Sequence, residues 1–188
     1  MALRKAAAYS KRYARPYTRK SKKKGKNYVK MYPPSKIVKF DMGDVSGFNQ
    51  GKFPILVRLV AGHDVQIRDT ALEAGRQVII KAMESNFGVS GFAAFLKVHP
   101  HHVLREHKML TGAGADRMSS GMSLSFGVSV GRAAMVKGGS DIFVVATNSE
   151  KGKKICREAY MKIRPKIPGS CVILVDEPPV KKATEIEA

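Results

Sequence analysis

Residues 69–88 read Asp69-Thr-Ala-Leu-Glu-Ala-Gly-Arg-Gln-Val-Ile-Ile-Lys-Ala-Met-Glu-Ser-Asn-Phe-Gly88, and their periodicity predicts an amphipathic core helix. Thr70 and Glu73 have the spacing of a capping box, and Gly88 marks the end. One apolar stripe comprises Ala71, Leu72, Gly75, Val78, Ile79, Ala82 and Met83. The opposite side carries Asp69, Glu73, Arg76 and Glu84. Ile80 also falls on this polar side, for no reason evident in the sequence.

Strand-like segments surround this helix. Apolar or alternating residues predict strands at 37–40, 53–60, 92–98, 103–105, 132–136, 142–146 and 171–175. Residues 41–47 have turn chemistry, and a second helix is expected at 149–164, with Ile155, Ala159 and Ile163 inward. This order of elements excludes a doubly wound parallel sheet. We therefore predict an α+β fold, with a mixed or antiparallel sheet and two packed helices.

Charge divides the chain into parts. The first 40 residues hold 14 of the 34 lysines and arginines and no acid, whereas residues 41–188 hold 20 basic and 15 acidic residues. We expect a basic arm at 1–34, one domain at 35–177 containing a flexible loop at 110–131, and a polar tail at 178–188.

The arm predicts a nucleic-acid partner. It repels itself and has too little apolar surface to fold alone, so a dense array of phosphates would order it, while its tyrosines can stack on unpaired bases. The candidate RNA-binding residues are Arg4, Lys5, Lys11, Arg12, Arg15, Tyr17, Arg19, Lys20, Lys22, Lys23, Lys24 and Lys26. An organellar transit peptide is a rival interpretation, since such peptides are also basic. No run approaches the roughly 20 apolar residues of a membrane span, and no secretory signal is evident, so no membrane partner is expected.

The glycine- and serine-rich loop is the other candidate site. Its glycines allow backbone amides to approach phosphate closely, and Arg117 could add a charge-assisted contact braced by Asp116. It lacks the Gly-Lys-Ser/Thr of a P-loop and does not fit a dinucleotide-binding fingerprint. An RNA-facing loop fits best; a mobile connection without a partner is the alternative.

Other chemistry is weakly indicated. Cys156 and Cys171 lack metal or disulfide spacing and are expected to be reduced and buried in a cytoplasmic protein. The histidines of His99-Pro-His-His102, with His107 nearby, lack further ligands, so we expect no metal and solvated or RNA-facing side chains. No catalytic constellation is recognisable, so we predict no enzyme, cofactor or small-molecule substrate.

The loop region carries a family resemblance. The run Val103-Leu-Arg-Glu-His-Lys-Met-Leu-Thr-Gly-Ala-Gly-Ala-Asp-Arg-Met118, preceded by His99–His102, resembles the hallmark of the large-subunit ribosomal protein family called L10e in archaea and eukaryotes and L16 in bacteria. Further matches lie at 36–43, 65–68, 71–74, 121–122 and 125–127, so the resemblance extends from about residue 15 to 175.

The resemblance implies an α/β-hammerhead fold and a structural role in the cytoplasmic ribosome. Its members lie against rRNA beside the peptidyl-transferase centre, among neighbouring ribosomal proteins, and help to position tRNA while RNA performs the chemistry. The implied residues facing the tRNA acceptor end are Arg105, Lys108, Thr111, Gly112, Ala113, Gly114, Ala115, Asp116, Arg117 and Met118. Further implied rRNA-binding residues are Arg68, His99, His101 and His102. The alternative is a non-ribosomal RNA-binding or RNA-chaperone protein.

This chain departs from the family pattern in two places. Ser123-Leu124 stands where relatives often have a basic residue, and Val128-Ser129 stands where they usually have Lys-Pro. The second half of the loop is therefore expected to make fewer of the usual phosphate contacts, and the lysine-rich arm could compensate.

Overall fold

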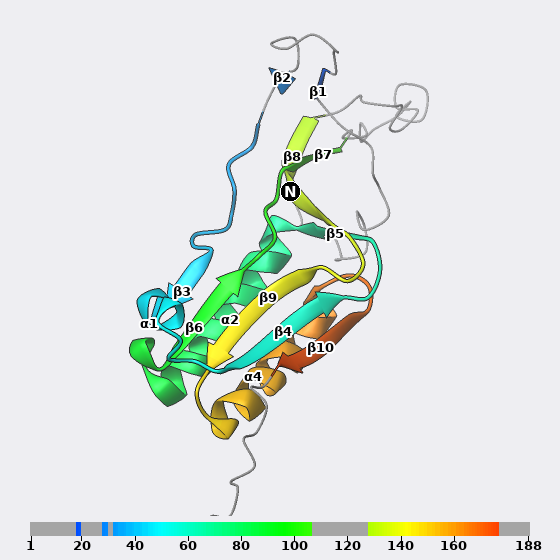
Figure 1. The fold of residues 1–188 in the computed structure, drawn as a ribbon. Coiled ribbons are helices and arrows are strands. Elements are labelled where there is room, and N and C mark those ends of the chain that lie inside the picture. Colours follow the sequence, from blue (N-terminus) through cyan, green and yellow to red (C-terminus); the bar gives the residue numbers. More distant parts are fainter. Residues whose placement is uncertain (1–17, 20–27, 30–31, 107–127, 177–188) are drawn as a thin grey trace, which may run out of the picture.

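The computed structural model describes residues 18–19, 28–29, 32–106 and 128–176, which form an α+β fold (Figure 1). A five-stranded sheet has the order β10 (Cys171–Asp176), β4 (Ile55–Ala61), β9 (Asp141–Thr147), β6 (Phe92–Leu96) and β3 (Asp41–Gly43). A three-stranded sheet has the order β5 (Val65–Arg68), β8 (Val128–Val136) and β7 (His102–Glu106). A short pair joins β1 (Thr18–Arg19) to β2 (Tyr28–Val29). Every strand pair in these ranges is antiparallel.

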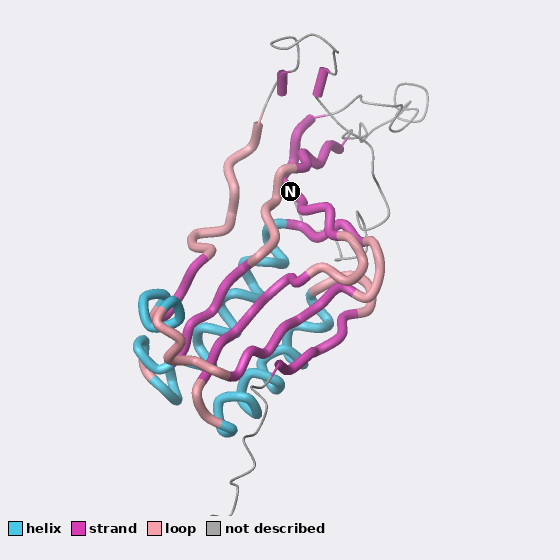
Figure 2. Tube along the Cα trace, viewed as in Figure 1, coloured by secondary structure: helices cyan, strands magenta, loops and turns pink. Residues whose placement is uncertain are grey.

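Two long helices cover one face of the five-stranded sheet. They are α2 (Asp69–Phe87) and α4 (Glu150–Ile163), and both lie behind the strands in Figure 2. The helices contribute Leu72, Ile79 and Tyr160 to the main core, each fully buried. The Tyr160 hydroxyl donates to the Val57 carbonyl oxygen at 2.9 Å, which satisfies the polar atom inside the core.

Shorter elements complete the domain. Helix α1 (Val45–Asn49) packs on the other face of the sheet, where the Phe48 and Phe95 rings lie 4.8 Å apart. The 3-10 turns η2 (Val89–Gly91) and η3 (Arg164–Lys166) follow α2 and α4. Both cysteines are free and buried, and burial raises the pKa of Cys156 to about 12, so this thiol is unreactive at neutral pH.

Most predicted elements are present. Helix α4 begins as expected, with the Ser149 side chain accepting from the Gly152 amide at 3.1 Å. The predicted inward residues Ala159 and Ile163 are buried, and Ile155 packs partly buried against the core. The last residues of the predicted loop, 128–131, instead form the start of β8.

Three local predictions were wrong. Residues 37–40 do not form a strand, and β3 begins directly after them at Asp41, where a turn was expected. A helix, α1, follows with Asp44 as its cap, and β5 had not been predicted. The capping box at Thr70 is also absent, because α2 begins directly after Arg68, which makes no side-chain cap.

The side of α2 that was expected to face solvent is largely covered. Asp69, Glu73 and Arg76 have exposed fractions of 3%, 9% and 9%. Their neighbour Ile80 is partly buried and packs against the main core, which accounts for an apolar residue among these polar positions. Periodicity separated apolar from polar residues correctly, but it did not separate buried polar residues from exposed ones.

Candidate RNA interface

The three-stranded sheet holds both ends of the predicted loop. Strands β7 and β8 pair antiparallel, and Glu106 lies opposite Val128, so the chain leaves and returns on adjacent strands. Directly opposite residues of such a pair are roughly 5 Å apart. Residues 107–127, including Lys108 and the predicted tRNA-facing residues 111–118, lie outside the described residues.

Two predicted RNA-binding residues are brought together by this sheet. Arg68 in β5 and His102 in β7 both lie opposite Ala133 of the central strand β8. Directly opposed residues share a face of the sheet, so Arg68 and His102 flank a small side chain on one surface. The fold thereby brings together a basic residue and a histidine that lie 34 positions apart in the chain, at the end of the β7–β8 ladder opposite the loop ends Glu106 and Val128.

Arg105 is buried rather than exposed. Its exposed fraction is 6%, on the strand that leads into the loop. We expect Arg105→Ala to lower the free energy of unfolding by about 1–3 kcal/mol, because it removes side-chain packing and leaves the polar groups that contact Arg105 without a partner. Chemical denaturation would measure this loss. The exposed Arg157→Ala is the control, expected to change stability by no more than about 0.5 kcal/mol, and equal effects would contradict the prediction.

The base of the arm, residues 32–40, is fixed beside the same sheet; we call it the arm root. The Arg132 guanidinium of β8 lies 3.9 Å from the centre of the Tyr32 ring, and its Nε donates to the Pro33 carbonyl oxygen. The Tyr32 hydroxyl donates to the His101 carbonyl oxygen at 3.1 Å. Arg132 was missed by sequence reasoning, since its partners lie about a hundred residues away and no local motif marks it.

The predicted histidine cluster supports the arm root. The His99 ring stacks on Phe40 at 4.4 Å, and the His101 ring lies 5.9 Å from His99. Within the part of the chain that the structure describes, no group of three or more His, Cys, Asp or Glu side chains could hold a metal. His99 and His101 are nevertheless exposed, so both rings are accessible to a partner at this surface.

Two carboxylates of α2 accept hydrogen bonds from backbone amides of the arm root. Asp69 accepts from the Lys36 amide at 3.2 Å, and Glu73 accepts from the Val38 amide at 3.3 Å. Within residues 37–40, the Val38 amide thus bonds to a side chain of α2 and not to the backbone of a neighbouring strand. The ionised carboxylates therefore position the segment from which the arm extends.

Burial and hydrogen bonding act oppositely on the two acids. Burial raises the pKa of Asp69 above its usual value, against the hydrogen bonds from Lys36 and Thr70. The hydrogen bond from Arg76 lowers the pKa of Glu73. Glu73 therefore contributes stability above its unfolded pKa that is lost as the pH falls, whereas the contribution of Asp69 changes with the opposite sign.

Asp69→Asn tests this difference. The amide oxygen can still accept from Lys36, so the arm root stays attached, but the titration is removed. Because the folded pKa of Asp69 is raised, wild type should lose stability relative to the variant as the pH rises from 3.8 through the folded pKa. Thermal unfolding of both proteins between pH 3 and 6 measures the difference, and a constant gap across that range would contradict the prediction.

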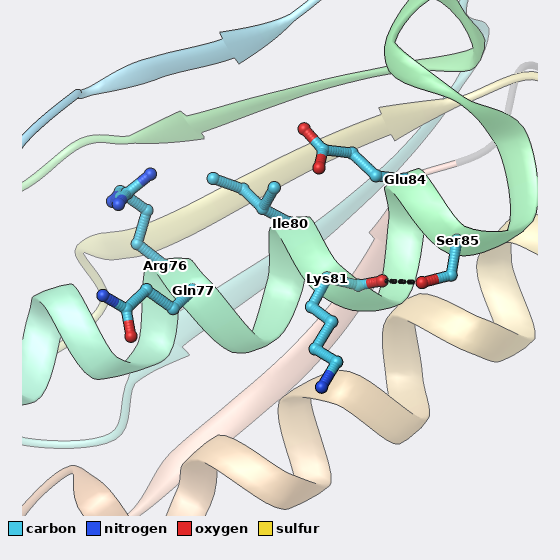
Figure 3. Close-up of a pocket in the computed structure, with 6 residues that line it drawn as sticks. All are labelled: Arg76, Gln77, Ile80, Lys81, Glu84 and Ser85. Atoms are coloured by element: carbon cyan, nitrogen blue, oxygen red, sulfur yellow. Dashed lines mark hydrogen bonds between the residues drawn. The ribbon is translucent and has the colours of Figure 1, made fainter.

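A shallow groove runs along α2. Its volume is about 390 Å³, and Figure 3 shows its lining residues Arg76, Gln77, Ile80, Lys81, Glu84 and Ser85, all from this helix. Arg76 is committed to its ion pair with Glu73, and the Ser85 hydroxyl donates to the Lys81 carbonyl oxygen. These residues do not converge on a common point, so the groove lacks the arrangement of a catalytic or cofactor site.

The remaining predicted residues are located as follows. Arg19 lies in β1, which pairs with β2, and the other arm residues predicted to bind RNA lie outside the described residues. Within the ranges that are described, no helix has the length and hydropathy to cross a bilayer. The candidate interface within the described residues therefore comprises the arm root, Arg132 and the exposed histidines that contact the arm root.

Comparison with known proteins bears on this interface. The family model for ribosomal protein L16p/L10e matches residues 14–174. Proteins named large ribosomal subunit protein uL16 are similar over most of the chain. That of Methanococcus maripaludis is 42% identical over 175 residues, covering 93% of this chain and 95% of the relative. That of Archaeoglobus fulgidus is also 42% identical, over 93% and 94% of the two chains. That of Thermofilum pendens is 41% identical, over 87% and 93%. The chain therefore belongs to the L16p/L10e family of ribosomal proteins.

Proposed function

We propose that this chain binds large-subunit rRNA through its arm and holds its glycine-rich loop toward the tRNA acceptor end near the peptidyl-transferase centre. As a member of this family, it is a structural constituent of the large ribosomal subunit and not an enzyme. The arm supplies phosphate neutralisation, and the loop supplies backbone amides at close range. The RNA performs the chemistry.

One observation carries the proposal. Strand β8 holds a loop end at Val128 and, through Arg132, the arm root at Tyr32 and Pro33. Figure 1 shows the three-stranded sheet and the β1–β2 pair toward the same end of the molecule. An RNA that orders the arm would therefore also fix the platform on which the loop stands. This coupling suits a protein that positions a ligand without reacting with it.

Deleting residues 1–31 tests the role of the arm while leaving its root attached. The deletion removes 12 lysines and arginines. We expect a flatter dependence of rRNA affinity on salt, since each phosphate contact contributes about 0.7–0.9 to the slope. Binding of both proteins to protein-free large-subunit rRNA would be measured from 50 to 200 mM salt. An unchanged slope would exclude the arm as the main RNA contact.

Crosslinking tests the role of the loop. A photoreactive residue placed at Ala115 should crosslink to the tRNA acceptor end in assembled subunits, whereas one at Tyr17 should crosslink to rRNA. Crosslinks from Ala115 to rRNA alone would contradict the tRNA part of the proposal. Retention of the protein on large subunits through a moderate salt wash provides the control for assembly.

A further inference from the structure

The surplus positive charge of the domain is concentrated in one segment. Residues 150–166, which comprise α4 and η3, contain seven lysines or arginines and two acids, a surplus of five. The whole of residues 41–188 has the same surplus, with 20 basic and 15 acidic residues. The rest of that range is therefore balanced, with 13 of each sign. One helix and its following turn account for all of the net charge after residue 40.

The cations of this segment face away from the core. Helix α4 buries Cys156, Ala159, Tyr160 and Ile163 against α2 and the sheet. The exposed cations are Lys151, Lys154, Arg157, Lys162, Arg164 and Lys166. Among described residues, the ion pair found on this segment joins Lys153 to Glu150 at 3.5 Å. The other acid of the segment, Glu158, is exposed and lies four residues from both Lys154 and Lys162. The cations still outnumber the acids along this exposed surface by five, so they repel one another.

Helix stability does not explain this arrangement. Cations at the end of a helix interact favourably with its dipole, which accounts for Lys162, Arg164 and Lys166. Lys151, Lys153 and Lys154 instead lie at the start of α4, near the positive end of the dipole. That position favours acids, and Glu150 is the acid present in the first turn. Lys153 has its ion pair with Glu150, but the helix dipole disfavours Lys151 and Lys154, so a binding role accounts for their position better than helix stability does.

We propose that the exposed basic face of α4 and η3 is a second RNA-binding surface, which contacts the phosphate backbone of an rRNA segment other than those met by the arm and loop. The inference rests on the proposed function, because it requires an RNA environment. From Lys151 to Lys162 the face extends about 16 Å along the helix, enough to meet several phosphates. Figure 1 shows α4 near the end of the domain opposite the β1–β2 pair, so one short RNA contact would not serve both surfaces.

Phosphate suits this surface better than an apolar partner does. Met161 is the exposed large hydrophobic residue that α4 presents in the described structure, with an exposed fraction of 56%. A single methionine among cations is too little apolar area for a protein-docking core or a membrane-binding face. It can lie against ribose or a base edge while the surrounding lysines contact phosphate.

The test compares two full-length variants with equal charge. One carries Lys151→Gln, Lys154→Gln and Lys162→Gln; the control carries Lys81→Gln, Lys97→Gln and Lys137→Gln, three exposed lysines elsewhere on the domain. Both lose three positive charges. The probe is protein-free rRNA extracted from large subunits of the source cells. We expect the salt slope of the first variant to fall by about 2, at 0.7–0.9 per lost contact, and that of the control by less than about 0.5.

Each outcome is decisive. An unchanged slope for the α4 variant, or equal falls in both variants, would overturn the inference, since the effect would then be absent or due to net charge alone. Normal rRNA binding with loss of the protein from washed subunits would also overturn it, because the surface would then contact a component of the subunit other than rRNA. If deleting residues 1–31 leaves the slope unchanged while the α4 variant lowers it, the proposed role of the arm fails and this inference stands. Thermal unfolding provides the folding control: the α4 variant should unfold close to the wild-type temperature, because losing two cations from the start of the helix offsets losing Lys162 from its last turn.

Discussion

Replacing Glu73 by alanine is expected to lower the free energy of unfolding by about 3–5 kcal/mol, the usual cost of removing one partner of a buried ion pair. The Glu73 carboxylate lies 2.5 Å from Arg76, and both residues have an exposed fraction of only 9%. Alanine would leave the Arg76 guanidinium buried, with Met42 Sδ as a weak remaining contact at 3.8 Å. It would also remove the acceptor of the Val38 amide, so the arm root should loosen as the domain loses stability. Urea denaturation measures the loss.

Two further variants make this result interpretable. Glu84→Ala changes an exposed acid on the same helix and should cost no more than about 0.5 kcal/mol. The double variant Glu73→Leu, Arg76→Leu removes both charges and should recover part of the loss, because an apolar pair leaves no buried charge unpaired. A double variant as unstable as Glu73→Ala would show that contact with the arm root, and not the unpaired arginine, dominates the effect.

The helix pattern predicted the scaffold well because it reports directly on burial. Leu72, Ile79 and Met83 were assigned to one stripe from their spacing, and all three are fully buried. The same pattern did not predict the burial of Asp69 and Glu73, because a polar residue on a helix is compatible with two different arrangements. It can face solvent, or it can be buried against a partner that supplies hydrogen-bond donors. The donors here are backbone amides of residues 36 and 38, which helical spacing cannot identify.

The site was only partly predictable for a related reason. Glycine composition and flanking strands placed the loop between β7 and β8. Arg132 could not be found in the same way, since its partners at Tyr32 and Pro33 are brought to it by the folded chain. Arg105 was implied by the family resemblance to act at the loop, and that prediction stays untested; its burial could not be predicted, because alternation along a short strand does not show what covers each face. Contacts between distant segments are the part of this interface that local sequence does not encode.

Ile79→Ala is expected to lower the free energy of unfolding by about 2–5 kcal/mol, because it opens a cavity in the main core. Ile79 is fully buried on the helix that packs against the sheet and α4. Ile80→Ala is the matched control: the same deletion at a partly buried neighbour should cost less, since the groove beside it already admits solvent. Urea denaturation of the two variants compares them, and an equal cost would contradict the assignment of core and groove sides to α2.

The same variant separates stability from binding. Ile79 lies inside the domain, away from the cations proposed to contact phosphate, so its replacement should leave the salt slope of rRNA binding unchanged at temperatures where the variant remains folded. Substitutions at Lys151, Lys154 and Lys162 should do the reverse, changing the slope while preserving stability. If Ile79→Ala altered the slope of the folded protein, the core would be coupled to the RNA surfaces. The arm root is the connection through which this would act, since Asp69 and Glu73 attach it to the helix that carries Ile79.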